Sequence, residues 1–109
     1  MIIEKLNNMI RGWFIGDFEP CVYRTREFEV GVLTHRKNEQ WDEHYHKIAN
    51  EINVLIEGKM IINGVHIEAG DIFIIKPNES SAPVFLEDCK IVCVKTPSVI
   101  GDKYAIIRE

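Results

Sequence analysis

The sequence has no long apolar run, no excess of positive charge and no pattern typical of a secretory signal. No apolar stretch approaches the length that a bilayer-spanning helix needs, so we expect no membrane partner. The 17 acidic residues outnumber the 13 basic ones and no basic patch stands out, which argues against nucleic acid as a partner. Glu4, Asn7 and Asn8 lie where a signal peptide requires an apolar segment, so we expect a cytoplasmic protein.

The sequence has few cysteines, and their number and spacing predict no disulfide. The three residues, Cys21, Cys89 and Cys93, are odd in number and include no Cys-x-x-Cys spacing. On one strand the Cα atoms of Cys89 and Cys93 would lie about 13 Å apart, too far for a disulfide. We therefore expect buried, reduced thiols, with a catalytic or metal-ligating thiol as the alternative.

The length of the chain fits one domain, and the sequence contains no repeat, linker or low-complexity segment. Within it we assign residues 1–27 to an N-terminal arm with strands, 28–95 to a barrel core and 96–109 to a C-terminal arm.

Short apolar runs, several of them alternating with polar residues, are broken by turn residues along most of the chain. They predict strands at 13–15, 28–33, 52–56, 60–62, 65–67, 72–75 and 91–94. Asn63-Gly64 is the pair best suited to a tight type I′ hairpin. Many short strands at this spacing predict an all-β sandwich or barrel.

The two ends of the chain have less regular patterns. Near-helical spacing of Ile2, Leu6, Met9 and Trp13 predicts one short N-terminal helix. Residues 104–107 form either a last strand or an arm onto a partner subunit.

The stretch from His44 to Gly58 contains the clearest chemistry. His44 and His46 are two residues apart, so on a strand both imidazoles point to the same face. Glu51 follows on the next strand, and alternation turns Asn53 inward with it, where the amide would hydrogen-bond a ligand or Glu51 itself. Two imidazoles and a carboxylate suit a divalent transition metal with open coordination positions.

The same alternation turns Ile52, Val54 and Ile56 to the opposite face of that strand. These apolar side chains need cover from a second sheet or from a partner subunit. Since a small domain also buries a limited fraction of its surface, we expect a homodimer.

These residues resemble the first motif of the cupin superfamily: Gly, five residues, His-x-His, three or four residues, Glu, six residues, Gly. His44, His46, Glu51 and Gly58 stand at the required intervals. Asn38 stands at the leading glycine, a mild change because asparagine tolerates the left-handed backbone. The resemblance covers residues 28–95 and implies a cupin-type jelly-roll β-barrel, a single all-β domain.

The second cupin motif is degenerate. It runs Gly, five residues, Pro-x-Gly, two residues, His, three residues, Asn. Gly70 begins it, but Pro77 arrives one residue late. The histidine position then holds Ala82 or Ser81, depending on where the count starts. The fourth metal ligand of the family is therefore missing.

Three consequences stay open. The site is a three-ligand metal site with more open positions, or Glu79, His35 or His66 substitutes for the missing ligand. Otherwise the metal is lost, and the histidines and glutamate serve as acid, base or sugar-binding groups; some cupins of the nucleotide-sugar epimerase and ketoisomerase type resemble this case, since they work without metal and use a histidine as base. We expect a divalent transition metal, one of Fe, Mn, Ni or Zn.

The resemblance implies an enzyme that acts on a small molecule. His44, His46 and Glu51 are the expected catalytic and metal-binding residues, and His35, Asn53 and Glu79 the expected ligand-binding residues. The two reaction classes implied are sugar or nucleotide-sugar isomerisation or epimerisation, and metal-dependent dioxygenation. The alternative is a non-catalytic ligand-binding, sensor or interaction cupin that has lost the fourth ligand.

Overall fold

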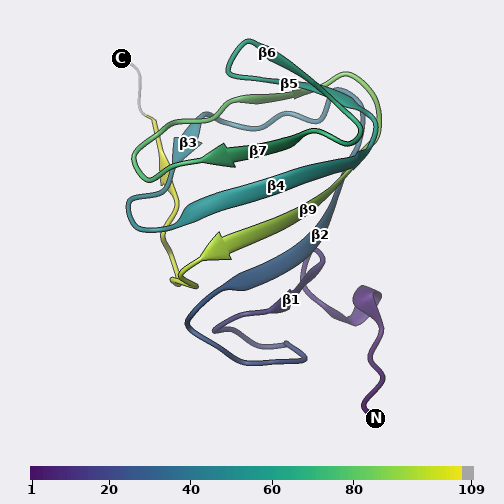
Figure 1. Cartoon of the computed structure of the whole chain (residues 1–109), viewed down its shortest axis with the longest axis vertical. Coiled ribbons are helices and arrows are strands. Elements are labelled where there is room, and N and C mark those ends of the chain that lie inside the picture. The colour runs from purple at the N-terminus through teal and green to yellow at the C-terminus, as the bar shows by residue number, and fades with distance from the viewer. Residues whose placement is uncertain (107–109) are drawn as a thin grey trace.

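Strands dominate the structure, a computed structural model in which residues 1–106 are described (Figure 1). A single 3-10 turn, η1 (Leu6–Asn8), precedes the strands of this part of the chain. The strands are β1 (Trp13–Ile15), β2 (Glu29–His35), β3 (His44–Tyr45), β4 (Asn50–Glu57), β5 (Lys59–Ile62), β6 (Val65–Glu68), β7 (Ile72–Ile75), β8 (Pro83–Phe85), β9 (Cys89–Thr96) and β10 (Tyr104–Ala105).

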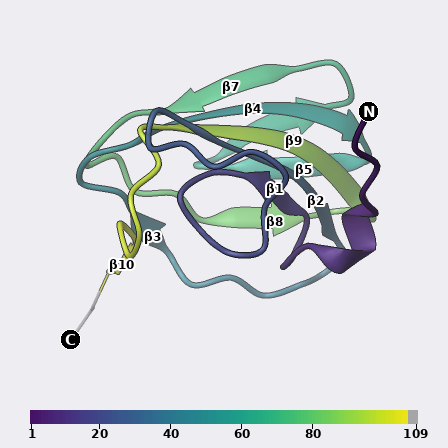
Figure 2. The same cartoon turned by 90° about the horizontal axis from the view of Figure 1, so that it is seen from below.

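The strands form two main sheets that face each other. The order of the five-stranded sheet is β1-β2-β9-β4-β7, and that of the three-stranded sheet is β6-β5-β8. Seen from below, β7, β4 and β9 lie over β5 and β8 as a second layer (Figure 2). The expected all-β class is confirmed, with the layering of a jelly roll, although no continuous hydrogen-bonded barrel closes among the described residues.

Strict alternation on β4 and β9 creates the core between the sheets. Leu55, Ile91 and Cys93 point inward and are buried, and Met60 and Phe85 meet them from the opposite sheet. Because successive side chains on a strand face opposite ways, one face of the large sheet is committed to this core. The inward positions near the other end of the same strands are polar, and they form the site described below.

Two turns have the backbone that their residues predict. Asn63 and Gly64 both have positive φ, 49° and 78°, and they join β5 to β6 as the expected tight hairpin. Asn38 adopts φ 65°, which confirms that it takes the left-handed conformation expected in place of glycine.

Gly58 is required by space as well as by backbone. Its φ is 97°, and a Cβ at this position would lie 2.4 Å from the carbonyl oxygen of Asp88. Any side chain would therefore push β4 and the following strand away from the start of β9.

The chain ends differ from expectation in one respect. The predicted N-terminal helix is wrong: only the three-residue turn η1 forms, since Asn7, Asn8 and Gly12 favour turns over a continued helix. At the other end, β10 pairs with β3 of the same chain, so a last strand forms over Tyr104–Ala105, and Ile107 lies outside the described residues. None of the helices in residues 1–106 has the length and apolarity to cross a membrane.

Candidate functional site

Polar residues from neighbouring strands meet on the inner face of the large sheet. Lys95 of β9 is in register with Glu29 of β2 and with Glu51 of β4. In the next inward row, Asn53 of β4 is in register with Cys93 of β9. Lys95, Glu51 and Asn53 line a cavity of about 770 Å³ between the sheets. Glu29 and the buried Cys93 do not line it.

His46 is held by the C-terminal segment. Its Nδ1–H donates a hydrogen bond to the carbonyl oxygen of Asp102, and the ring is 3% exposed. The carboxylate of Asp102 accepts hydrogen bonds from the amides of Lys47, Ile48 and Ala49, at 2.9, 3.1 and 2.9 Å. Burial raises the pKa of Asp102, but these three hydrogen bonds outweigh it and hold the pKa below its usual value. Asp102 therefore fixes both the loop after His46 and the orientation of its ring.

The other ring nitrogen of His46 is left without a partner among the described residues. Nε2 is buried and makes no hydrogen bond, and the nearest carboxylate oxygen, Oε1 of Glu51, is 3.9 Å away. Because Nδ1 carries the proton given to Asp102, Nε2 is the atom that carries the lone pair when the ring is neutral. A buried lone pair without a donor is costly, so this atom is suited to a cation or to a ligand proton.

His44 lies beside this pair and borders the cavity. Its ring centroid is 5.5 Å from that of His46, and the rings meet edge to face. Burial lowers the pKa of His44, so the imidazole is neutral at pH 7. The backbones of His44 and Ser81 exchange hydrogen bonds of 3.1 and 2.8 Å. Ser81, one of the two candidates for the missing histidine position, therefore lies directly across from the first motif.

These residues fit a divalent metal in chemistry but do not form a closed set. Neutral imidazoles and a carboxylate are suitable donors, and a ring N–H given to a backbone carbonyl is typical of metal-bound histidine. Within residues 1–106, however, no three side chains of histidine, cysteine, aspartate or glutamate converge closely enough to hold an ion. The arrangement is a pair, His46 and Glu51, with His44 adjacent.

Cys93 is inward beside Glu51 but is not a thiolate. Burial raises the pKa of its thiol strongly, and the neighbouring carboxylate of Glu51 raises it further. Cys93 is fully buried, Cys89 is almost fully buried and Cys21 is half-buried, and all three are free thiols. The expectation of reduced thiols agrees with this arrangement.

The expected ligand-binding residues divide into two groups. Asn53 is 4% exposed and lines the cavity, and its amide nitrogen has no hydrogen-bond partner in residues 1–106. His35 lines the cavity as well. Glu79 is not brought to the site, because it is exposed and its Oε1 accepts the amide of Lys76 at 3.1 Å within a turn. His66 is exposed on β6, and neither Glu79 nor His66 lines the cavity as a substitute ligand.

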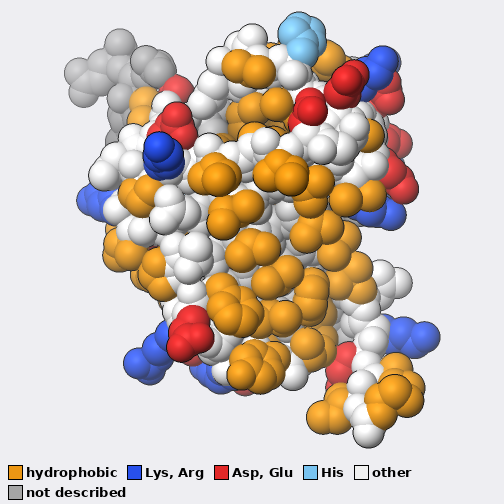
Figure 3. Space-filling view, viewed as in Figure 1, with side chains coloured by type: hydrophobic (Ala, Val, Ile, Leu, Met, Phe, Trp, Pro, Cys, Tyr) orange, Lys and Arg blue, Asp and Glu red, His pale blue; other side chains and the backbone are white. Residues whose placement is uncertain are grey.

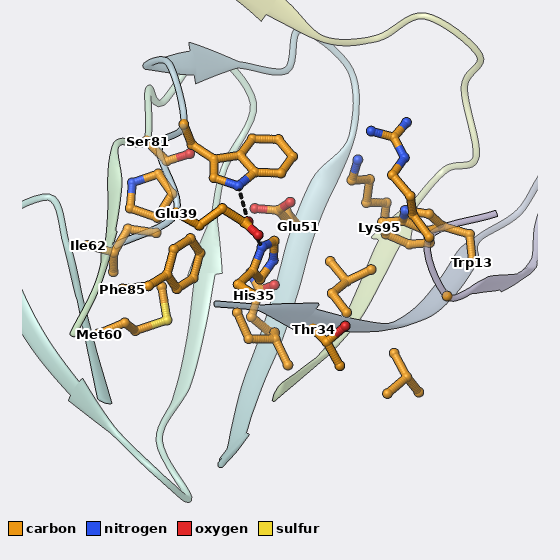
Figure 4. A pocket seen from close by; sticks show the side chains of 18 of the residues that line it. Trp13, Thr34, His35, Glu39, Glu51, Met60, Ile62, Ser81, Phe85 and Lys95 are labelled. Atoms are coloured by element: carbon orange, nitrogen blue, oxygen red, sulfur yellow. Dashed lines mark hydrogen bonds and ion pairs between the residues drawn. The ribbon is translucent and has the colours of Figure 1, made fainter. Parts of the chain in front are cut away.

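Two cavity residues that the sequence analysis did not select complete a cluster around His35 (Figure 4). Oε2 of Glu39 lies 2.5 Å from Nδ1 of His35 and 2.5 Å from Nε1 of Trp41. Burial raises the pKa of Glu39, but the hydrogen bonds from Trp41, His35 and the Arg36 amide together lower it below its usual value. The ionised carboxylate accepts from both rings. The only local signal was the turn residue Asn38, whose backbone amide donates to the carbonyl of Phe85 on β8.

Comparisons with solved structures bear on the fold of the chain. No family model and no curated protein matches the chain. A solved structure from Klebsiella pneumoniae, described as an uncharacterized conserved protein with a double-stranded beta-helix domain, is 21% identical, with 97% of each chain covered and a TM-score of 0.71.

Two further structures are similar over a smaller part of the chain. A cupin-2 domain containing protein from Shewanella frigidimarina is 17% identical over 66% of this chain and 72% of that one, with a TM-score of 0.56. The nucleoside dehydratase Pac13 of Streptomyces is 13% identical over 75% and 70%, with a TM-score of 0.67. At these identities the likeness concerns the fold.

Proposed function

We propose, with the cupin fold of the chain as the premise, that the protein is a small cupin enzyme that binds a divalent transition metal and acts on a small molecule. His44, His46 and Glu51 are the proposed ligands. Fe, Mn, Ni and Zn are the candidate ions, because each accepts imidazole and carboxylate donors. That Pac13 is a nucleoside dehydratase supports a small-molecule enzyme on this fold.

One observation carries the proposal. Nε2 of His46 is buried and unpartnered in the described chain, and it lies 3.9 Å from Oε1 of Glu51. The Nδ1–H of the same ring is already committed to the carbonyl of Asp102. The protein thus maintains a lone pair next to a carboxylate without an internal donor, which a cation would satisfy.

The chain and the ion have separate roles in this proposal. When bound, the metal supplies Lewis acidity or a redox centre to a substrate oxygen. His44 and Glu51 orient the substrate at the cavity wall, and Asn53 offers an amide donor to a substrate oxygen. Isomerisation or epimerisation of a sugar and dioxygenation remain the two reaction classes proposed.

Elemental analysis of the purified full-length chain tests the metal. We expect about one metal ion per chain, lost in His46→Ala and Glu51→Ala. His66→Ala is the matched control, because His66 is exposed on the hairpin and away from the site. A wild-type protein that stays metal-free after dialysis against Fe, Mn, Ni and Zn would refute the metal proposal.

A second candidate function, acid–base catalysis without metal, is favoured by the pair His35 and Glu39. Oε2 of Glu39 lies 2.5 Å from Nδ1 of His35 and accepts its N–H, which leaves Nε2 as the ring atom that can take a proton from a ligand. The ring also stacks on Phe85, with centroids 4.3 Å apart, which fixes its plane at the cavity wall. A histidine oriented by a carboxylate is an arrangement suited to moving a proton.

The two candidates are separated by ligand screening with and without chelator. A thermal-shift panel of nucleotide sugars, sugar phosphates and small carboxylic acids identifies binders, which are then incubated in D₂O and examined for deuterium incorporation by NMR. Under the acid–base mechanism, exchange persists in EDTA and is lost in His35→Asn. If exchange disappears with EDTA and survives in His35→Asn, the metal proposal is favoured.

The remaining expectation is a homodimer, which we propose forms through the outer face of the large sheet. The outer face consists of two cross-strand rows, Val30-Val94-Ile52-Ile74 and Val32-Val92-Val54-Ile72. Apolar side chains dominate this side of the molecule (Figure 3). A flat aliphatic face is self-complementary, since it packs against a second copy as two sheets do in a sandwich. The unpaired thiols support a reducing compartment such as the cytoplasm.

A further inference from the structure

The cavity has an apolar side and a cationic side. Ile62, Met60 and Phe85 line one side, and Lys95 and Trp13 lie opposite them (Figure 4). A ligand that fills such a space has an apolar body and a polar end, because each end then meets its own chemistry. The polar groups at the cationic side decide the charge of that end.

Three cations share the cavity although the chain carries a net charge of −4. Arg11, Lys95 and Lys103 all line it. Lys95 is compensated, since its Nζ lies 3.8 Å from Glu29 and its backbone is in register with Glu51. In residues 1–106, neither Arg11 nor Lys103 has a carboxylate within the 4.0 Å of an ion pair. Two positive charges therefore line the cavity without an ion pair in the described chain, although the carboxylates of Glu39 and Glu51 line it too.

The ammonium group of Lys103 lies over the ring of Trp41, which also lines the cavity. Its Nζ lies 4.3 Å from the centroid of the Trp41 ring. Burial lowers the pKa of Lys103, and repulsion from Lys95 and Arg11 lowers it further, against attraction from Glu51 and Asp42. Like charges held this close are relieved by an anion that reaches them together.

We propose that the cavity binds a small molecule with an apolar or aromatic body and one anionic head group, a carboxylate or a phosphate monoester, which faces Arg11 and Lys103. This inference rests on the proposed function in one respect, because it assigns the ligand class of the same cavity. It does not depend on the metal. The amide nitrogen of Asn53, buried and without a partner in the described chain, is a further donor to the bound molecule.

Tryptophan fluorescence provides a direct assay. The protein has two tryptophans, Trp13 and Trp41, and both line the cavity. The probes are phenyl phosphate and benzoate, each compared with a neutral compound of similar size, phenol and benzyl alcohol. Titrations are run on the protein as purified and after dialysis against EDTA. We expect both anions to bind about tenfold more tightly than their neutral counterparts in both preparations, and less tightly as NaCl increases.

The variants Lys103→Gln and Arg11→Gln locate the effect. Each is expected to weaken anion binding about tenfold and to leave phenol binding unchanged. Lys47→Gln is the matched control, because Nζ of Lys47 also lies 4.3 Å from an aromatic centroid, that of Tyr104, but lines no part of the cavity. A difference between phenyl phosphate and benzoate identifies which of the two head groups the site takes.

The possible failures are distinguishable. Equal affinity for anions and neutral compounds, or anion binding unaffected in both cavity variants, would overturn the anion site and leave the small-molecule cavity intact. Anion binding that vanishes after EDTA treatment would also overturn it, since the anion would then be bound through the metal. Absence of quenching and of thermal shift with every probe would count against both the inference and the proposed function.

Discussion

The carbonyl oxygen of Asp102 accepts the Nδ1–H of His46, although 56 residues separate them in the sequence. The side chain of the same aspartate binds three successive amides in the loop that follows His46. One residue of the C-terminal segment therefore sets the tautomer of a proposed metal ligand and the course of the chain next to it. This link makes the C-terminal segment part of the site.

Replacement of Asp102 by asparagine tests that link. The variant loses the charge that accepts three amides, so we expect the free energy of unfolding to fall by about 2 kcal/mol. Because the carbonyl is displaced from His46, metal affinity should fall about tenfold. Denaturant unfolding and metal titration measure the two effects. Asp71→Asn is the control, since Asp71 accepts a single amide, that of Glu68, in a distant turn, and metal affinity should be retained. Wild-type metal affinity in Asp102→Asn would contradict the link.

At Asn53 we expect the stability of the fold and the binding of a ligand to make opposite demands on the side chain. Its amide nitrogen is buried without a partner in residues 1–106, which costs free energy in the ligand-free protein. Asn53→Leu, of similar size, should raise the free energy of unfolding by about 1 kcal/mol and weaken ligand binding. Urea unfolding and fluorescence titration are the measurements. Asn53→Ala removes the same amide but leaves space, so it should be destabilised, and a destabilised leucine variant would show that the amide is satisfied.

Glu39 should make stability depend on pH. Its folded-state pKa lies below the ordinary 4.5, so as the pH falls the unfolded chain takes up the proton first. The stabilisation is complete above 4.5 and is lost as the pH falls through the folded-state pKa. We expect Glu39→Gln to be about 1 kcal/mol less stable than wild type at pH 7, with the difference shrinking below pH 4.5. Urea unfolding across this range measures it, and a constant difference would refute the interpretation.

Local pattern was sufficient for most of the large sheet. Alternation along 52–56 predicted β4 and correctly placed Asn53 inside, and the apolar run at 91–94 predicted β9. Turn chemistry did the same for the Asn63-Gly64 hairpin, because left-handed backbone is a property of the residues themselves. In contrast, β3 and β10 have two residues each, too few to show any period, and they depend on long-range pairing with each other and, for β3, with Ser81.

The site was predictable only in part, for a related reason. The spacing of His44 and His46 is a local feature, whereas the partner of His46 is supplied by Asp102, a residue in an irregular segment at the other end of the chain. Glu39 and Trp41 lie in a loop without periodicity, so nothing in the sequence places them against His35. Long-range contacts of loops depend on how the sheets pack, which single-sequence patterns do not contain.

The outer face of the large sheet predicts the oligomeric state. Ile74 is 54% exposed at the end of one aliphatic row, on the edge strand β7, so a lysine there can reach solvent in a monomer but would be buried in a dimer. Ile74→Lys should therefore convert the dimer to a monomer, as measured by light scattering coupled to gel filtration, with little change in circular dichroism. Val65→Lys is the control, because Val65 is 58% exposed on β6, outside that face, and should remain dimeric. A wild-type protein that is monomeric at micromolar concentrations would rule out this interface, and so would an Ile74→Lys variant that stays dimeric.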